Sequence, residues 1–289
     1  MLRLRTLLVL AVTTAVVAGS ISSALARSDR IKGANPFDSS HETVDLFEAI
    51  EQGTLSVKLI PRDSKECRLM ITNESQESVN VQLPAALSAV PVVAQILPGA
   101  VPGMNQGFDQ GFDQGSSNAP QRLGVGNPFG RQSPLQMGPN MQGNPLMNPG
   151  NGPFFAPFNI APEKVAHLKL PSVCLDHGHP DPRPAMQYRL EPIASVTELK
   201  ELVLLCSRLG SAEVSQRVAQ AAAWHLSNGK TWEQLQAMRI RGLGRPDRPF
   251  FHAYEVVQAK KLVEELAAEA RTKAKLRKPR EVVSLSMAE

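Results

Sequence analysis

Residues 55–83 read Leu55-Ser-Val-Lys-Leu-Ile-Pro-Arg-Asp-Ser-Lys-Glu-Cys-Arg-Leu-Met-Ile-Thr-Asn-Glu-Ser-Gln-Glu-Ser-Val-Asn-Val-Gln-Leu83. Apolar residues take alternate positions in three runs of this stretch, at 55–59, 67–71 and 79–83. A period of two predicts strands with one buried face, and the segments between the runs are rich in turn-forming Pro, Asp, Asn and Ser. Short strands at this spacing favour a small antiparallel β-sandwich of the immunoglobulin-like type.

Three strands cannot close a sandwich, so further strands are expected later in the chain. Alternation returns at 165–175 and at 186–190. Between the two groups, residues 99–153 are rich in Gly, Pro, Asn and Gln and nearly free of charge. Such a composition buries too little apolar surface to offset its ordering entropy, which predicts a disordered low-complexity insertion. The β-sandwich domain is therefore expected to be split between residues 40–98 and 154–192.

The insertion also has a second interpretation. Its phenylalanines, Phe108, Phe112 and Phe129, together with scattered Met residues, suit a weakly binding interaction arm. A linker is the favoured interpretation, because polar Gly, Asn and Gln composition commonly marks loops.

Helical spacing replaces alternation from about residue 195. Ser or Thr residues at helix starts and Gly residues at helix ends recur through this region, and Thr231-Trp-Glu-Gln234 has the pattern of a capping box. These signals predict a C-terminal helical bundle as a domain of residues 193–278, followed by a loose tail at 279–289. The fold class expected from the whole chain is α+β.

The first residues have the pattern of a secretory signal peptide at 1–26. Arg3 and Arg5 form a basic start, an apolar stretch follows, and Ala24-Leu-Ala26 is a small-residue cleavage motif that places cleavage between Ala26 and Arg27. The alternative is an uncleaved membrane anchor, for which the apolar stretch is short. We expect an exported protein of the periplasm, the cell envelope or the extracellular space, with no transmembrane anchor after cleavage.

Charge gives no reason to expect a nucleic-acid partner. The formal net charge is +4, and loss of Arg3 and Arg5 with the leader leaves 29 basic and 27 acidic residues. A near-balanced chain lacks the strong positive field that attracts a phosphate backbone.

Three cysteines, Cys67, Cys174 and Cys206, allow at most one internal disulfide. Cys67 and Cys174 both lie in predicted strands, and a bridge between them is one hypothesis. Their alternation places Cys67 inward and Cys174 outward, which counts against it. Cys206 lies on the apolar face of a predicted helix and is interpreted as a small core residue.

One short stretch brings Cys, His and Asp residues, the types that bind metals or act in catalysis, close together in the chain. It is residues 171–184, Pro171-Ser-Val-Cys-Leu-Asp-His-Gly-His-Pro-Asp-Pro-Arg-Pro184. Cys174, His177 and His179 form a candidate zinc or copper site, although no second Cys/His cluster accompanies them. A Cys174–His nucleophile pair is a second hypothesis, and a proline-constrained turn with exposed His side chains is the simplest one.

Trp224, His225 and Trp232 are a candidate ligand-stacking patch. Aromatic residues beside helix ends more often serve packing.

Several motifs together resemble a family of exported proteins of planctomycete-type bacteria that carries a Gly/Gln/Met-rich insertion and has no assigned activity. The residues that carry the resemblance are Val44–Ile50 with Val57–Pro61, Val79–Pro84, Val173–Gly178 with Pro180–Pro182, Gln216–Leu226, Asn228-Gly229 and Trp232–Leu235. The resemblance covers most of the chain after Ala26. It implies export and the domain layout given above, and it implies no catalytic residues.

The expected function is that of an exported, non-catalytic structural or interaction protein of the cell envelope, with a protein or envelope component as its partner. The alternative is a metal- or thiol-dependent enzyme centred on Cys174, His177 and His179. No catalytic residue, and no cofactor beyond that candidate zinc or copper, is predicted.

Overall fold

The structure, a computed structural model, describes residues 31–92, 119–129, 157–242, 244 and 246–277. The expected leader and tail, and most of the expected insertion, lie outside these residues. Within the described residues, no helix is both long and apolar enough to cross a membrane.

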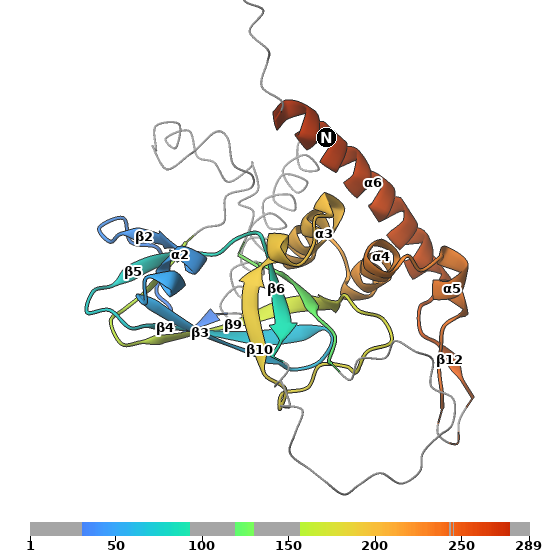
Figure 1. Ribbon diagram of the computed structural model, residues 1–289, viewed down its shortest axis with the longest axis horizontal. Helices are drawn as coiled ribbons and strands as arrows, with labels where there is room; N and C mark the ends of the chain where they lie inside the picture. Colours follow the sequence, from blue (N-terminus) through green and yellow to red (C-terminus); the bar gives the residue numbers. More distant parts are fainter. Residues whose placement is uncertain (1–30, 93–118, 130–156, 243, 245, 278–289) are drawn as a thin grey trace, which may run out of the picture.

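Six antiparallel strands form a closed β-barrel (Figure 1). Each strand pairs with the next in the order β3 (Leu55–Pro61), β4 (Glu66–Asn73), β9 (Val165–Cys174), β7 (Leu123–Gly126), β6 (Ala86–Pro91) and β10 (Tyr188–Pro192), and β10 pairs back to β3. The predicted immunoglobulin-like sandwich is therefore wrong, and the fold is a mixed α+β barrel. The physical reason is β9, which pairs with β4 along one edge and with β7 along the other, so one sheet closes on itself.

The alternating runs supply the interior of this barrel. Leu59 of β3 lies opposite Leu69 of β4, which lies opposite Leu168 of β9. All three are buried, while the intervening Lys58 and Arg68 are exposed. Inward and outward residues alternate along each barrel strand, as the period of two predicts.

The third predicted strand takes a different place from the first two. β5 (Val79–Gln82) lies outside the barrel in a three-stranded sheet, parallel to β2 (Thr43–Asp45) and antiparallel to β8 (Phe158–Ile160). Helix α2 (Leu46–Glu51) follows β2 directly, and the Asp45 carboxylate caps it by accepting the backbone N–H groups of Phe47 and Glu48. The short β1 (Ile31–Lys32) pairs with the first half of β9.

Strand β7 corrects the expected insertion. It lies inside residues 99–153, yet all four of its residues are buried and it closes the barrel between β6 and β9. Asn127 just after it is fully buried, and its side-chain amide donates to the carbonyl oxygens of Leu83 and Pro84. Residues 119–129 are thus part of the folded core.

Four helices follow the barrel strands and the short 3-10 helix η2 (Ile193–Ser195). They are α3 (Lys200–Gly210), α4 (Gln216–Asn228), α5 (Trp232–Ala237) and α6 (Ala253–Arg277). The capping box predicted at Thr231 and Gln234 is confirmed. A two-stranded hairpin of β11 (Arg239–Ile240) and β12 (Arg248–Pro249) separates α5 from α6.

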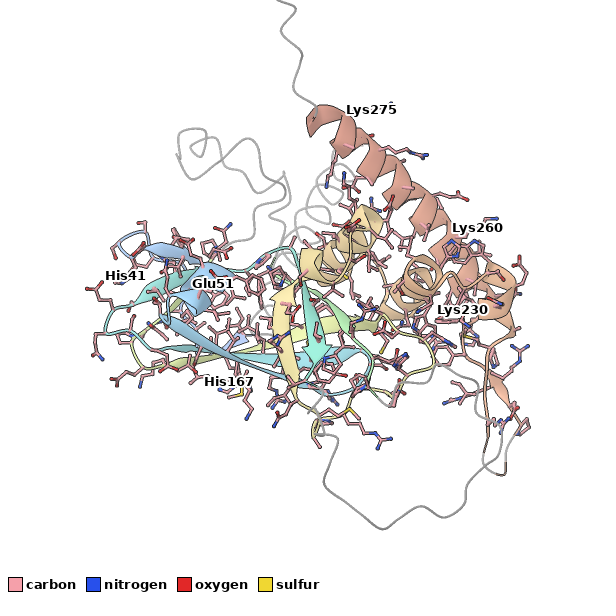
Figure 2. The ribbon with its side chains drawn as sticks, viewed as in Figure 1. His41, Glu51, His167, Lys230, Lys260 and Lys275 are labelled. Atoms are coloured by element: carbon pink, nitrogen blue, oxygen red, sulfur yellow. The ribbon has the colours of Figure 1, made fainter. Side chains whose placement is uncertain are left out.

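Helices α3 and α4 pack on the barrel, and α6 crosses both of them on the side away from it (Figure 1). Lys260 and Lys275 project from the outer face of α6 (Figure 2). Buried side chains of the barrel and of the helices belong to one continuous hydrophobic cluster. These contacts argue against a helical region that folds independently of the strands.

Two glycines bring the helix layer close to the barrel. A Cβ on Gly126 of β7 would stand 2.4 Å from the backbone nitrogen of Gly210 in α3 and 2.5 Å from the carbonyl oxygen of Cys206. A Cβ on Gly210 would stand 2.3 Å from the carbonyl oxygen of Asn127. The two backbones therefore touch where no side chain fits between them.

Candidate functional site

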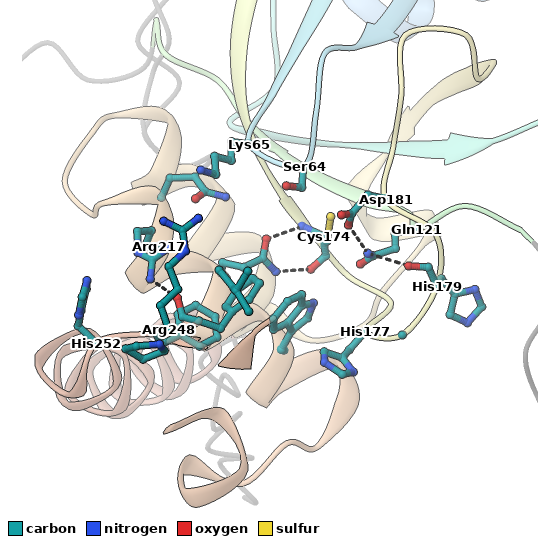
Figure 3. A pocket seen from close by; sticks show the side chains of 18 residues that line it. Ser64, Lys65, Gln121, Cys174, His177, His179, Asp181, Arg217, Arg248 and His252 are labelled. Carbon is teal, nitrogen blue, oxygen red and sulfur yellow. Dashed lines mark hydrogen bonds between the residues drawn. The ribbon is translucent and has the colours of Figure 1, made fainter. Parts of the chain in front are cut away.

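A cleft of about 720 Å³ opens where one end of the barrel meets the helices. Its walls come from six places in the sequence: the turn between β3 and β4, Gln121 just before β7, the end of β9 with the loop after it, helix α4, Ile240 of β11, and the segment from β12 to the start of α6. Figure 3 shows Lys65, Arg217 and Arg248 on one side of the cleft, and Gln121, Asp181, His177 and His179 on the other. The loop that the sequence singled out, 171–184, thus reaches the cleft.

Gln220 of α4 fixes the end of β9 at the centre of the cleft. Its side-chain amide donates to the carbonyl oxygen of Cys174 and its Oε1 accepts the Cys174 backbone N–H, both at 2.9 Å. Gln216, one helical turn earlier, donates to the carbonyl oxygen of Ser172 at 3.2 Å. Through these two glutamine side chains, α4 forms hydrogen bonds with the backbone of the last residues of β9, as a neighbouring strand would.

The structure does not bring the predicted metal ligands together. The His177 ring packs edge-on against Trp224, with ring centroids 4.7 Å apart, and His179 Nδ1 lies 3.0 Å from the carbonyl oxygen of Ala119. Among the described residues, no group of three His, Cys, Asp or Glu side chains is arranged to hold a metal ion.

Cys174 has the properties of a buried structural thiol. It is 1% exposed, and burial together with the nearby Asp181 and Asp176 carboxylates raises the pKa of its thiol. A protonated thiol without a hydrogen-bonded imidazole is a poor nucleophile. The Cys174–His pair that the sequence offered as a nucleophile is therefore not assembled here.

The hypothesised disulfide between Cys67 and Cys174 is not formed. Cys67, Cys174 and Cys206 are all free and buried. Cys67 points into the barrel, where its Sγ lies 3.7 Å from the carbonyl oxygen of Leu170 on β9. Cys206 lies in the core between α3 and β7, as its place on the apolar helix face predicts.

Two acidic residues shape the loop after β9. Asp176 pairs with Arg122, accepting from its backbone N–H at 2.9 Å and from its guanidinium at 2.5 Å. Partial burial acts to raise the pKa of Asp176, but the bonds and charge of Arg122 outweigh it and hold that pKa below its usual value. Asp181 accepts a hydrogen bond from Gln121 Nε2 at 3.0 Å.

The opposite side of the cleft is cationic. Arg217 is largely neutralised by Glu255, whose carboxylate accepts from Arg217 Nε at 2.6 Å, and Arg217 also donates to the carbonyl oxygen of Phe250. The side chains of Lys65 and Arg248 form no hydrogen bond or ion pair with another described residue. Two positive charges therefore line the cleft with no counter-ion from the part of the chain that the structure describes.

Two buried polar atoms beside the cleft also lack a partner in the described part of the chain: Gln121 Oε1 and Trp224 Nε1. The orientation of the Gln121 amide is fixed, because its nitrogen already donates to His179 O and Asp181 Oδ1 at 3.0 Å each. An unpaired buried polar atom costs about 1–3 kcal/mol, so both atoms lower the stability of this region.

Sequence reasoning found the loop and weighed Trp224, but it missed Lys65, Arg248, Gln121 and Gln220. Lys65 and Arg248 are ordinary exposed cations, and their place in one cleft depends on how the helical region packs on the barrel. Gln121 lies in the segment interpreted as disordered. Gln220 sits among small apolar residues of α4, and a buried polar residue at that position was a usable signal of a side-chain bond.

Comparisons of the chain with protein-family models, with curated proteins and with solved structures each find no match.

Proposed function

We propose that this chain is an exported, non-catalytic protein of the cell envelope that binds a protein or envelope component in the cleft between barrel and helices. The observation that carries this proposal is which reactive and charged side chains of the cleft are free to meet a ligand. Cys174, the nucleophile that the sequence offered, is buried and its pKa is raised, whereas Lys65 and Arg248 are exposed and have no partner among the described residues. Such a site is suited to hold a ligand rather than to transform it.

The alternative, a metal- or thiol-dependent enzyme at Cys174, His177 and His179, has less support. The two imidazoles are engaged elsewhere, with Trp224 and with Ala119. Zinc or copper bound at one equivalent to the purified protein, and lost in His177→Ala, would restore this alternative.

Export is supported by the leader pattern that ends at Ala26. The three buried thiols are compatible with export, because burial shields a free cysteine in an oxidising compartment. Amino-terminal sequencing of the protein from fractionated cells is expected to begin at Arg27. A chain that keeps its first 26 residues in the cytoplasm would contradict export.

The binding role is tested by filling the cleft. Ser64 is half-buried in the cleft wall, so Ser64→Trp places an indole in the space a ligand needs. The matched control is Lys58→Trp, which adds the same bulk at an exposed position on β3 away from the cleft. Both variants and the unmodified protein are used to capture components of an envelope extract, which are quantified by mass spectrometry.

We expect a component that the unmodified protein and Lys58→Trp capture equally and that Ser64→Trp loses. Equal capture by all three proteins would show that the cleft is not the binding site.

A further inference from the structure

We propose that the cationic side of the cleft recognises an oxyanion, a carboxylate or phosphate group carried by the ligand. This inference rests on the proposed binding role of the cleft and names the chemistry that it recognises. Lys65 and Arg248 both line the cleft, from the β3–β4 turn and from β12, and neither has a counter-ion among the described residues. Two cations from separate elements that line one open space offer a site for an anion.

The Lys65 backbone is fixed, so its side chain is presented from a defined place. The Asp63 carboxylate accepts the backbone N–H groups of Lys65 at 2.8 Å and of Glu66 at 3.0 Å. The Lys65 carbonyl oxygen accepts the backbone N–H of Ser172 at 2.8 Å. Every polar backbone group of this residue is therefore used, and only the ammonium group remains for a ligand.

Arg248 is presented by the hairpin in a comparable way. It lies opposite Ile240 in the β11–β12 ladder, and the backbone N–H of Phe250 donates to the carbonyl oxygen of Met238 at 2.9 Å. The guanidinium group offers parallel N–H donors that match the two oxygens of a carboxylate or phosphate. Arg248 suits the oxyanion itself, while Lys65 adds a second charge.

The other charged groups of the cleft place the anion on this side. Arg217 contributes little free charge, because Glu255 accepts from two of its nitrogens, at 2.6 and 2.9 Å. Asp181 repels an anion, and it lies across the cleft beside Gln121 (Figure 3). The middle of the cleft, which Gln220 and Trp224 line, is then left to the neutral part of a ligand.

Calorimetric titration of the full chain tests this assignment with three probes: inorganic phosphate, glutarate as a dicarboxylate, and 1,5-pentanediol as an uncharged molecule of similar length. The variants are Lys65→Gln and Arg248→Gln, which remove one charge each at exposed positions. Arg241→Gln is the matched control, because Arg241 is exposed on the same hairpin but does not line the cleft.

We expect phosphate or glutarate to bind and pentanediol not to bind, and the better of the two anions identifies the natural oxyanion. Each cleft variant should weaken that binding about tenfold, the effect of losing one charge-assisted hydrogen bond, and the control should bind as the unmodified protein does. Binding should also weaken as salt is raised, because both cations are exposed.

Three results would overturn the oxyanion assignment: neither anion binds at 10 mM (about the weakest affinity of interest), the diol binds as well as the anions, or Lys65→Gln and Arg248→Gln bind the anion unchanged. None of these results would contradict the proposed function, because that proposal is tested separately, by whether Ser64→Trp loses a component that the unmodified protein and Lys58→Trp capture. Loss of capture specificity with intact anion binding would instead remove the proposed function and leave the anion site.

Discussion

At the scale of single residues, the contact between Gly126 and Gly210 sets how closely the helices approach the barrel. Gly126→Ala places a methyl group 2.4 Å from a backbone atom that cannot rotate away. We expect this change to lower the free energy of unfolding by about 3 kcal/mol, because α3 must shift off β7. Urea unfolding followed by tryptophan fluorescence measures the loss.

Gly229→Ala is the matched comparison for that experiment. Gly229 ends α4 with a φ of 63°, and a Cβ there meets no atom within 4 Å. Only the left-handed backbone opposes the new side chain, at a cost of about 1 kcal/mol. A loss at Gly126 no larger than the loss at Gly229 would contradict the close contact between the two layers.

The buried thiols make stability depend on pH in the alkaline range. Burial raises the pKa values of Cys67 and Cys206 to about 12. Because these folded-state values lie above the unfolded value of about 8.5, the stabilisation is complete below about pH 8.5 and is lost as pH rises toward 12. The free energy of unfolding should fall by up to about 1.4 kcal/mol per pH unit for each thiol.

Urea unfolding between about pH 7 and pH 10.5 measures this slope. Cys206→Ala removes one titrating thiol and should make the slope shallower, even though the variant is less stable at neutral pH. An unchanged slope in Cys206→Ala would show that the thiol does not carry the effect.

At the same scale, the sequence indicated where the site lies but not how its residues are used. Cys174, His177 and His179 drew attention because they crowd together in the chain. Their side chains nevertheless go to different places: Cys174 is buried at the end of β9, the His177 ring packs on Trp224, and His179, beyond the turn at Gly178, lies against the carbonyl oxygen of Ala119. Spacing along a loop does not determine side-chain direction.

At the scale of elements, Gln220 joins α4 to the end of β9. Gln220→Ala leaves the backbone N–H and carbonyl oxygen of Cys174 buried without partners. We expect a loss of about 3 kcal/mol in the free energy of unfolding. Gln216→Ala removes a single hydrogen bond to Ser172 and should cost about 1 kcal/mol.

Urea titration of the two variants side by side measures that difference. Equal losses would mean that the two-bond connection through Gln220 adds nothing to the packing of α4 on the barrel.

Most elements could be predicted from local pattern, and β7 could not. β3, β4 and the first part of β9 alternate because one face of each is buried and the other is more exposed. β7 is buried on both faces, between the barrel interior and α3, so its sequence Leu-Gly-Val-Gly shows no polar alternation. The glycines that suggested disorder are the residues that let the helix approach.

At the scale of the whole molecule, the sandwich prediction failed because closure is a long-range property. Correct strands are compatible with two stacked sheets or with one closed sheet. The choice depends on the pairing of Leu123, which lies inside the expected insertion, with Cys174, which lies 51 positions later and beyond its end. Nothing in the pattern of either strand specifies that register.

The shared core predicts that barrel and helices unfold together. Val218 is 3% exposed on α4, and Val218→Asp buries an unpaired carboxylate there at a cost of several kcal/mol. Fluorescence of Trp224 and Trp232 reports on the helices, and pulsed alkylation of Cys67 reports on the barrel interior. Both signals should change at the same urea concentration in the unmodified protein and at the same lower concentration in the variant.

A Val218→Asp protein that loses its helical signal while Cys67 stays protected would favour two independent domains.

The central claim is that segments far apart in the sequence form one binding site. Hydrogen–deuterium exchange of the full chain, with and without the oxyanion probe that binds best, tests it most directly. We predict slower exchange with the probe at three places together: the turn at Ser64 and Lys65, the loop at 174–181, and residues 248–252. Slower exchange at only one of these places, or confined to another part of the chain, would contradict a single cleft built by barrel and helices.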